Sequence, residues 1–265
     1  MTFSELQVPP LDTARRLAEH GDFDGAVAIL TELVADPDGP DRAQAAVGLA
    51  VVLDERGDHE AARAAARVAL ATGHPEFAAQ AACHLAQGFE REGRAEQARG
   101  AWQAVLGVGT AAYVPLARLA LARLAVAVGD YDEAEDELRA ALAVAGPDVA
   151  AHAAQQLADL LLERGEPGEA AEVLLEALEV APEDEVARLR VQLGIAHLEL
   201  ACAEFAGAVE DGGDAPTSGL AIELLARTLP LRGRADDAGR VWTYGLEHED
   251  ETLAAEVRLR YDRDA

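Results

Sequence analysis

The chain has 265 residues, of which 22 are basic and 49 are acidic, and its formal net charge is −27. Its apolar share of 50% is too high for an intrinsically disordered chain, and no apolar run reaches the roughly 18 residues of a membrane helix. Nucleic-acid-binding proteins attract phosphates with dense basic patches, which this chain lacks. We therefore expect a soluble globular protein that binds neither nucleic acid nor membrane.

The residue types narrow the compartment and the chemistry. There is no Lys and no Asn, which excludes a P-loop and a Schiff-base enzyme. The two cysteines, Cys83 and Cys202, are far apart and form no CxxC motif, which suits a reducing compartment. The first ten residues have no basic segment followed by an apolar one, so we expect no signal peptide and a cytoplasmic protein. The acidity indicates a solvated surface or, alternatively, a basic partner.

Small residues recur along the chain with a fixed period, which is the signature of a repeat protein. Markers 36 residues apart, with one shorter last step of 32 residues, are Gly21, Gly57, Gly93, Gly129, Gly165, Ala201 and Gly233. Alanine stands five residues after every marker, at Ala26, Ala62, Ala98, Ala134, Ala170, Ala206 and Ala238. A small residue stands seven residues before every marker, at Ala14, Ala50, Ala86, Ala122, Ala158, Gly194 and Ala226.

Each period predicts a helix, a turn and a second helix. Upstream of Gly129, apolar residues such as Leu116 and Leu119 recur three and four apart, as on one face of a helix. The glycine ends that helix because it tolerates the left-handed conformation. Asp130 can then cap the next helix, which carries Leu138 on its apolar face. A single hairpin buries little, so stacked hairpins must share one core.

In chain order, the pattern predicts seven such hairpins and a last helix. The expected repeats span residues 7–42, 43–78, 79–114, 115–150, 151–186, 187–218 and 219–249, and a helix over about 250–262 covers the open end. The sixth repeat departs from the others. Its second helix is predicted to begin near Ala203 and to run into residues 210–219, where three glycines and a proline indicate a loop or a shortened helix.

The segment Gly129-Asp-Tyr-Asp-Glu-Ala134, followed by Leu138 and Ala141, resembles the tetratricopeptide repeat (TPR), as do Leu193-Gly194 and Pro182. The resemblance covers about residues 7–248. It implies an all-α, right-handed α-solenoid of about seven helix-turn-helix repeats with a C-terminal capping helix, forming a single domain over residues 1–265. Two features depart from the family. The period is 36 rather than about 34 residues, and the usual large aromatic of the first helix is missing.

Residues that could carry out catalysis are not grouped in the sequence. The seven histidines form neither an HxxxH nor an HExxH motif, and serine occurs only at Ser4 and Ser218. Cys83 and His84 are neighbours in a predicted helix, where adjacent side chains do not face each other. We therefore expect no enzyme activity, no metal site and no cofactor.

The resemblance implies that the first helix of each repeat lines a concave groove with its second, fifth, ninth, twelfth and thirteenth residues. In repeat two these positions include Gln44, Val51 and Glu55. Mixed polar side chains over an apolar floor suit an extended peptide or a helix. The candidate partner-binding residues are Gln80, Cys83, Gln87, Leu116, Leu119, Arg123, His152, Gln155, Asp159, Arg188, Val191 and Ile195.

Two arginines of this groove allow two interpretations. Arg123 and Arg188 either anchor an acidic partner segment or pair with carboxylates of the chain itself, such as Asp159 or Glu163. Without Lys and Asn, the groove lacks the residues with which other TPR domains clamp the carboxyl terminus of heat-shock chaperones. Two tryptophans, Trp102 and Trp242, stand at the same position of repeats three and seven, where we expect core packing.

The sequence therefore favours a non-enzymatic scaffold that binds a peptide or protein segment in its concave groove. One alternative is a regulatory sensor whose superhelix binds a small molecule or a signal peptide, with the break at 210–219 as a hinge. Another is a structural unit that assembles with copies of itself. We expect the chain to be a monomer or a weak homodimer.

Overall fold

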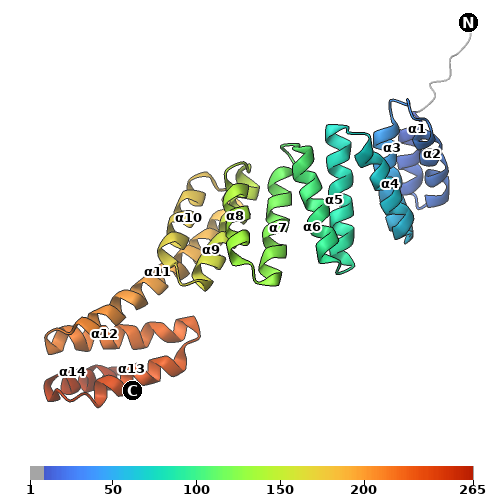
Figure 1. Ribbon diagram of the computed structural model, residues 1–265. Coiled ribbons are helices and arrows are strands. Elements are labelled where there is room, and N and C mark those ends of the chain that lie inside the picture. The colour runs from blue at the N-terminus through green and yellow to red at the C-terminus, as the bar shows by residue number, and fades with distance from the viewer. Residues whose placement is uncertain (1–8, 265) are drawn as a thin grey trace, which may run out of the picture. The chain divides into compact units, whose positions relative to one another are not determined.

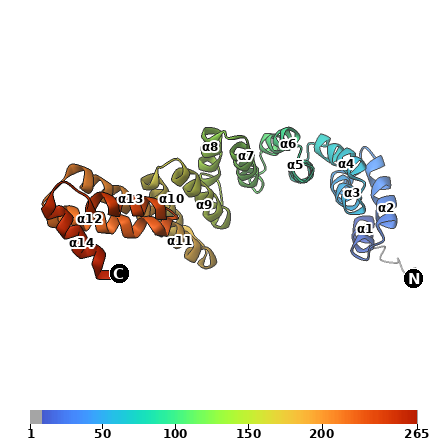
Figure 2. The ribbon, with the colours of Figure 1, turned by 90° about the horizontal axis from the view of Figure 1, so that it is seen from below.

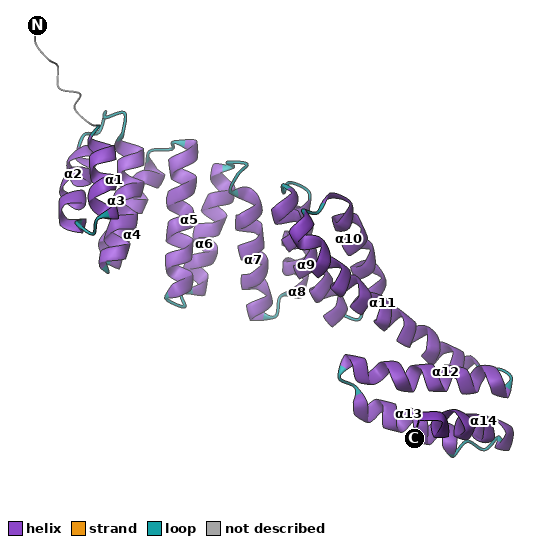
Figure 3. Cartoon of the chain, turned by 180° about the vertical axis from the view of Figure 1, so that it is seen from behind, coloured by secondary structure: helices purple, strands orange, loops and turns teal. Residues whose placement is uncertain are grey.

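The computed structural model describes residues 9–264, which form fourteen α-helices, two 3-10 segments and no strand (Figure 3). The first eight helices are α1 Pro10–Glu19, α2 Phe23–Ala35, α3 Arg42–Arg56, α4 His59–Ala71, α5 Pro75–Arg91, α6 Ala95–Val108, α7 Val114–Val128 and α8 Tyr131–Leu142. The remaining elements are α9 Pro147–Glu163, α10 Pro167–Val180, α11 Glu183–Asp211, α12 Ala215–Thr228, η1 Leu229–Arg232, α13 Ala235–Leu246, α14 Glu251–Tyr261 and η2 Asp262–Asp264. Of the helices in this range, none is both long and apolar enough to cross a membrane.

The described chain divides into two compact units, and the division falls inside α9. We refer to residues 9–153 as the N-terminal unit and to residues 154–264 as the C-terminal unit. In the N-terminal unit, successive helices pair as α1–α2, α3–α4, α5–α6 and α7–α8, and each pair packs on the next (Figure 1). The odd-numbered helices lie on one side and the even-numbered helices on the other (Figure 2). This stacking of hairpins confirms the predicted all-α solenoid fold class.

The predicted turn chemistry is confirmed at the marker glycines. Gly129 has a φ of +79°, in the left-handed region, and its N–H donates to the carbonyl oxygen of Val126 at 3.0 Å. The carboxylate of Asp130 then accepts a hydrogen bond from the N–H of Glu133 at 3.1 Å. These contacts satisfy backbone groups at the end of α7 and the start of α8 that have no partner within the helices. The other marker glycines have φ values between +70° and +91°.

The periodic alanines are buried on both helices of a hairpin. Ala122 of α7 is 1% exposed and Ala134 of α8 is fully buried. A buried methyl side chain lets packed helix backbones approach closely. The same two positions are buried in every repeat except the sixth, where Gly194 is exposed and Ala206 is only half-buried.

The sixth repeat is not a hairpin, and the prediction of a second helix that begins near Ala203 is wrong. Instead, α11 is one continuous helix of 29 residues from Glu183 to Asp211. Its marker position is occupied by Ala201, and a residue with a Cβ adopts the left-handed conformation only at a cost of roughly 1–2 kcal/mol. Alanine is also the best helix former, so the helix continues until Gly212, where φ is +67°.

In the C-terminal unit, α12 contacts α11, α13 and α14. The predicted break at 210–219 is confined to residues 212–214, between α11 and α12. Asp214 caps α12 by accepting a hydrogen bond from the N–H of Thr217 at 2.9 Å. The expected last helix is present as α14, which packs on α12 and α13. The exact limits of the seven sequence repeats remain a prediction.

Candidate interaction surface

The side of the N-terminal unit built by α1, α3, α5 and α7 carries exposed apolar side chains. We define the first-helix face as the exposed side chains of these four helices. Val51, Leu116 and Val126 are large apolar residues on this face, and each is about two-fifths exposed. Val51 and Leu116 stand at the ninth and second positions of their repeats, where the resemblance implied a groove. Exposed apolar side chains of this kind are available to pack against a partner.

A cavity of about 320 Å³ lies on the first-helix face between α1 and α3. Its floor is formed by the apolar and small side chains of both helices and by Leu30 of α2. Gly48 contributes no side chain, and a Cβ at that position would lie 3.5 Å from Leu30. The absence of larger side chains at Ala14, Ala18 and Gly48 therefore creates the hollow. The lining residues are Leu11, Ala14, Arg15, Ala18, Glu19, Leu30, Gln44, Gly48, Val51, Val52 and Glu55.

The rim of this cavity is polar and partly unengaged. Arg15 is exposed, and its side chain has no ion pair or hydrogen bond within residues 9–264. Gln44 on the opposite helix is half-buried and likewise has no side-chain partner in that range. A guanidinium offers donors only, whereas a side-chain amide both donates and accepts. The rim can therefore pair with a carboxylate and with a peptide backbone.

The sequence reasoning found only half of this cavity. Gln44, Val51 and Glu55 of α3 stand at predicted groove positions, but none of the candidate binding residues lies on α1. The same register applied to repeat one gives Leu11, Arg15, Ala18 and Glu19 at its fifth, ninth, twelfth and thirteenth positions. All four line the cavity. The sequence therefore contained the information to predict these four residues, because Gly21 sets the register of repeat one in the same way that Gly57 sets the register of repeat two.

Further along the first-helix face, charged side chains pair with one another between repeats. Arg123 donates to Glu90 at 2.5 Å, although the two residues are 33 positions apart. The other oxygen of Glu90 accepts the indole N–H of Trp102 at 2.6 Å. Of the two interpretations for Arg123, pairing within the chain is therefore the one present, with a different carboxylate from those named. In the C-terminal unit, Arg188 pairs with Glu185 of the same helix, α11, at 3.4 Å.

A second inter-repeat cluster surrounds Asp54 of α3. Its carboxylate accepts hydrogen bonds from Arg91 of the next first helix and from the His59 ring, the latter at 2.7 Å. Burial alone would raise the pKa of Asp54, but the His59 hydrogen bond and the Arg91 charge together hold it below its usual value. His84 lies 4.0 Å from the same carboxylate, and burial lowers the pKa of its ring.

The remaining predicted residues of the N-terminal unit differ in exposure. Gln87 is exposed, while Gln80 is half-buried and donates to Glu76 at 2.7 Å. Leu119 was expected to be exposed, and this is wrong, because it is 7% exposed. Burial raises the pKa of the half-buried Cys83 thiol to about 11, so it stays protonated at neutral pH. His152, at the end of this unit, is exposed.

In the C-terminal unit, the predicted residues lie on α9 and α11. Gln155 was also expected to be exposed but is 7% exposed, because α11 covers it. Its amide donates to Glu185 at 2.9 Å, while Gln192 donates to Asp159 at 2.7 Å. Val191 is exposed and Ile195 is half-buried.

The two tryptophans, which occupy the same repeat position, differ in environment. Trp102 is 4% exposed and belongs to the core between α5, α6 and α7, as predicted. Trp242 is half-buried, and its ring centroid lies 5.2 Å from that of Tyr261 in α14. Within residues 9–264, no three His, Cys, Asp or Glu side chains are grouped as metal ligands would be.

The comparison with family models identifies the repeats. Models described as tetratricopeptide repeat match residues 11–82 and 113–183, which together are more than half of the chain. The chain belongs to the tetratricopeptide repeat family. Repeats of this family generally act as protein–protein interaction scaffolds that bind proteins or peptides, and they are generally non-enzymatic.

Solved structures share the fold at low sequence identity. A tetratricopeptide repeat protein from Parabacteroides merdae ATCC 43184 is 16% identical with a TM-score of 0.50, over 95% of this chain and 97% of that one. The apo form of the quorum sensor NprR from B. thuringiensis is 13% identical with a TM-score of 0.50, over 88% of this chain and 73% of that one. No curated protein matches the chain significantly.

Proposed function

We propose that the chain is a non-enzymatic scaffold that binds a protein or peptide segment on the first-helix face of its N-terminal unit. The cavity between α1 and α3 carries this proposal. It combines an apolar floor with a guanidinium and an amide that are not engaged elsewhere. An apolar side chain of the partner fits the floor, and a carboxylate or backbone carbonyl fits Arg15.

The ion pairs farther along the face limit how the partner is held. Arg123 is already paired with Glu90, and Asp54 with Arg91. A partner carboxylate that bound Arg123 or Arg91 would replace an existing ion pair with a new one. Exposed ion pairs contribute little net energy, so this exchange adds little to the binding free energy. The binding energy is therefore expected from Val51, Leu116 and the cavity, with the Gln87 amide aligning the partner backbone. We retain Gln80 and Arg123 as secondary contacts of the proposal.

The test compares two variants with equal changes in charge. In the first, Arg15→Glu and Val51→Glu alter the first-helix face. In the control, Arg67→Glu and Ala28→Glu alter exposed residues of α4 and α2 on the opposite side. Each pair makes the net charge more negative by three, because it adds two carboxylates and removes one guanidinium. We expect the wild type and the control variant to capture the same proteins from native lysate. The first variant should no longer capture them.

Either of two results contradicts the proposal. Proteins retained equally by both variants would place binding elsewhere on the chain. No specific capture by the wild type would remove the scaffold role on this face. We expect both variants to fold, because all four residues lie outside the buried core. Circular dichroism checks this expectation.

A further inference from the structure

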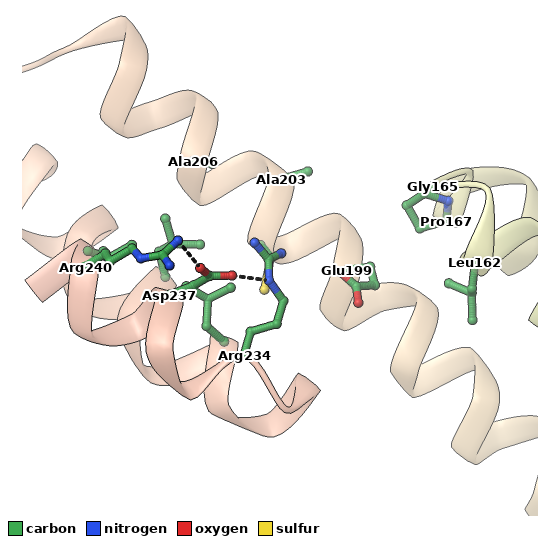
Figure 4. A pocket seen from close by; sticks show the side chains of 13 residues that line it. Leu162, Gly165, Pro167, Glu199, Ala203, Ala206, Arg234, Asp237 and Arg240 are labelled. Carbon is green, nitrogen blue, oxygen red and sulfur yellow. Dashed lines mark hydrogen bonds and ion pairs between the residues drawn. The ribbon is translucent and has the colours of Figure 1, made fainter.

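An apolar hollow lies in the C-terminal unit, beside the continuous helix α11. It has a volume of about 560 Å³ and lies between α11 and α13, with α12 as its floor and the α9–α10 turn at one end (Figure 4). Volumes of this size are typical of small-molecule sites. The apolar floor and walls are Leu162, Cys202, Ala203, Ala206, Leu225, Leu229 and Val241.

The hollow follows from the continuous helix α11. Because no turn forms at Ala201, the segment around Ala203 and Ala206 remains on α11 and does not fold back as a second helix. Both α11 and α13 pack on α12, and the small side chains of α11 leave the space between them open. The hollow extends along α11 into a second one of about 380 Å³, which Val209, Glu210 and Tyr244 also line.

Two guanidinium groups stand at the edge of the hollow, held by one carboxylate. Asp237 accepts from Arg234 Nε at 2.8 Å and from an Arg240 terminal nitrogen at 3.1 Å (Figure 4). The Arg240 side chain is 81% exposed and that of Arg234 is 53% exposed. A guanidinium has five N–H donors, and Asp237 takes one from each. Within the described chain, no other acceptor engages either group.

The other carboxylate at the hollow does not compete for these donors, because Glu199 is paired with Arg232. Glu210 is exposed at the far end of the second hollow. An apolar pocket with open guanidinium donors at one place matches a molecule with an apolar body and a single anionic head. The distance along α11 from Glu199 to Val209 is about 15 Å at 1.5 Å per residue, which accommodates an extended ten-carbon chain.

We propose that the C-terminal unit binds an alkyl carboxylate in this hollow, with the carboxylate on Arg234 and Arg240 and the chain over Leu225, Leu229 and Val241. The site is independent of the first-helix face, since it lies in the other unit and shares no residue with it. Binding would add to scaffolding a response to a small amphiphilic anion.

Sodium decanoate, below its micelle concentration, is the probe for this site. Titration is followed by calorimetry and by methyl NMR of the full chain. We expect saturable binding with shifts concentrated at Leu225 and Leu229. Arg234→Gln with Arg240→Gln should weaken binding at least tenfold. Ala203→Phe fills the hollow from an exposed position and should weaken it similarly. The decyltrimethylammonium cation, which has the same tail, should bind at least tenfold more weakly.

A matched control is Arg190→Gln with Arg258→Gln, which removes the same charge from exposed arginines outside the hollow. It should bind decanoate as the wild type does. The proposal is overturned by the absence of saturable binding, by equal weakening in the control pair, or by equal affinity for the cationic probe. None of these results affects capture on the first-helix face, so the two proposals fail separately.

Discussion

The fourth and sixth repeats share one sequence register but fold differently. In the fourth repeat, α7 ends at Val128 before Gly129, α8 begins at Tyr131, and the small residues Ala122 and Ala134 are both buried. In the sixth, the marker is Ala201, the helix runs through it, and the matching Gly194 and Ala206 are exposed and half-buried. The comparison teaches that the apolar pattern permits a hairpin, whereas a residue that tolerates a positive φ decides whether the turn forms.

The largest expected effect separates a turn from a helix at position 201. In a continuous helix, Ala201→Pro removes a backbone hydrogen bond and clashes with the preceding turn, at a cost of about 3 kcal/mol or more. Ala201→Gly then distinguishes the two structures by the sign of its effect, because glycine costs about 1 kcal/mol inside a helix but stabilises a turn that needs a positive φ at this position. Urea unfolding monitored by circular dichroism measures the difference. A gain in stability from Ala201→Gly would show that α11 is interrupted there after all.

A smaller effect tests the turn of the fourth repeat. Gly129→Ala forces an alanine into the left-handed region and should lower the free energy of unfolding by about 1–2 kcal/mol. No atom lies within 4 Å of the added Cβ, so the cost is conformational and not steric. The matched control is Gly100→Ala inside α6, also without neighbours, which should stabilise the chain by up to about 1 kcal/mol. Equal effects of the two substitutions would refute the role of the turn glycine.

The smallest effect concerns the contacts between regular repeats. Because the folded state holds the pKa of Asp54 below its ordinary value of 3.8, ionised Asp54 stabilises the fold above that pH. This contribution disappears as the pH falls through the lower, folded-state pKa. Asp54→Asn should therefore cost about 1 kcal/mol at pH 7 and less at pH 3. Thermal melts of both proteins across this range measure the difference, and a gap that is constant with pH would contradict the assigned pairing.

Most of the fold of the N-terminal unit could be predicted from the sequence. Helix pairs, turn glycines and the Asp130 cap follow from local chemistry that repeats with the period, and the structure confirms them. The prediction for the sixth repeat is wrong because its periodic alanines favour a hairpin, whereas Ala201, which replaces the turn glycine, continues the helix. That substitution was visible in the sequence and carried the correct signal.

The candidate site could be predicted less well, because position within a repeat does not determine contacts between repeats. Leu119 and Gln155 stand at nominal groove positions but are buried by packing. Arg123 also stands at a groove position, and its partner Glu90 belongs to the preceding repeat. The two residues are 33 positions apart, so a pattern within one repeat does not predict their contact. The cavity between α1 and α3 depends on three small residues whose effect appears only when two helices are placed side by side.

Site-specific photocrosslinking tests the central claim most directly. A photoreactive amino acid replaces Val51 on the first-helix face or, as the matched control, Ala28 on the exposed side of α2. The chains are irradiated in native lysate and the adducts are identified by mass spectrometry. We predict a specific protein adduct from position 51 and none from position 28. Adducts from position 28 alone, or the same adducts from both positions, would contradict binding on the first-helix face.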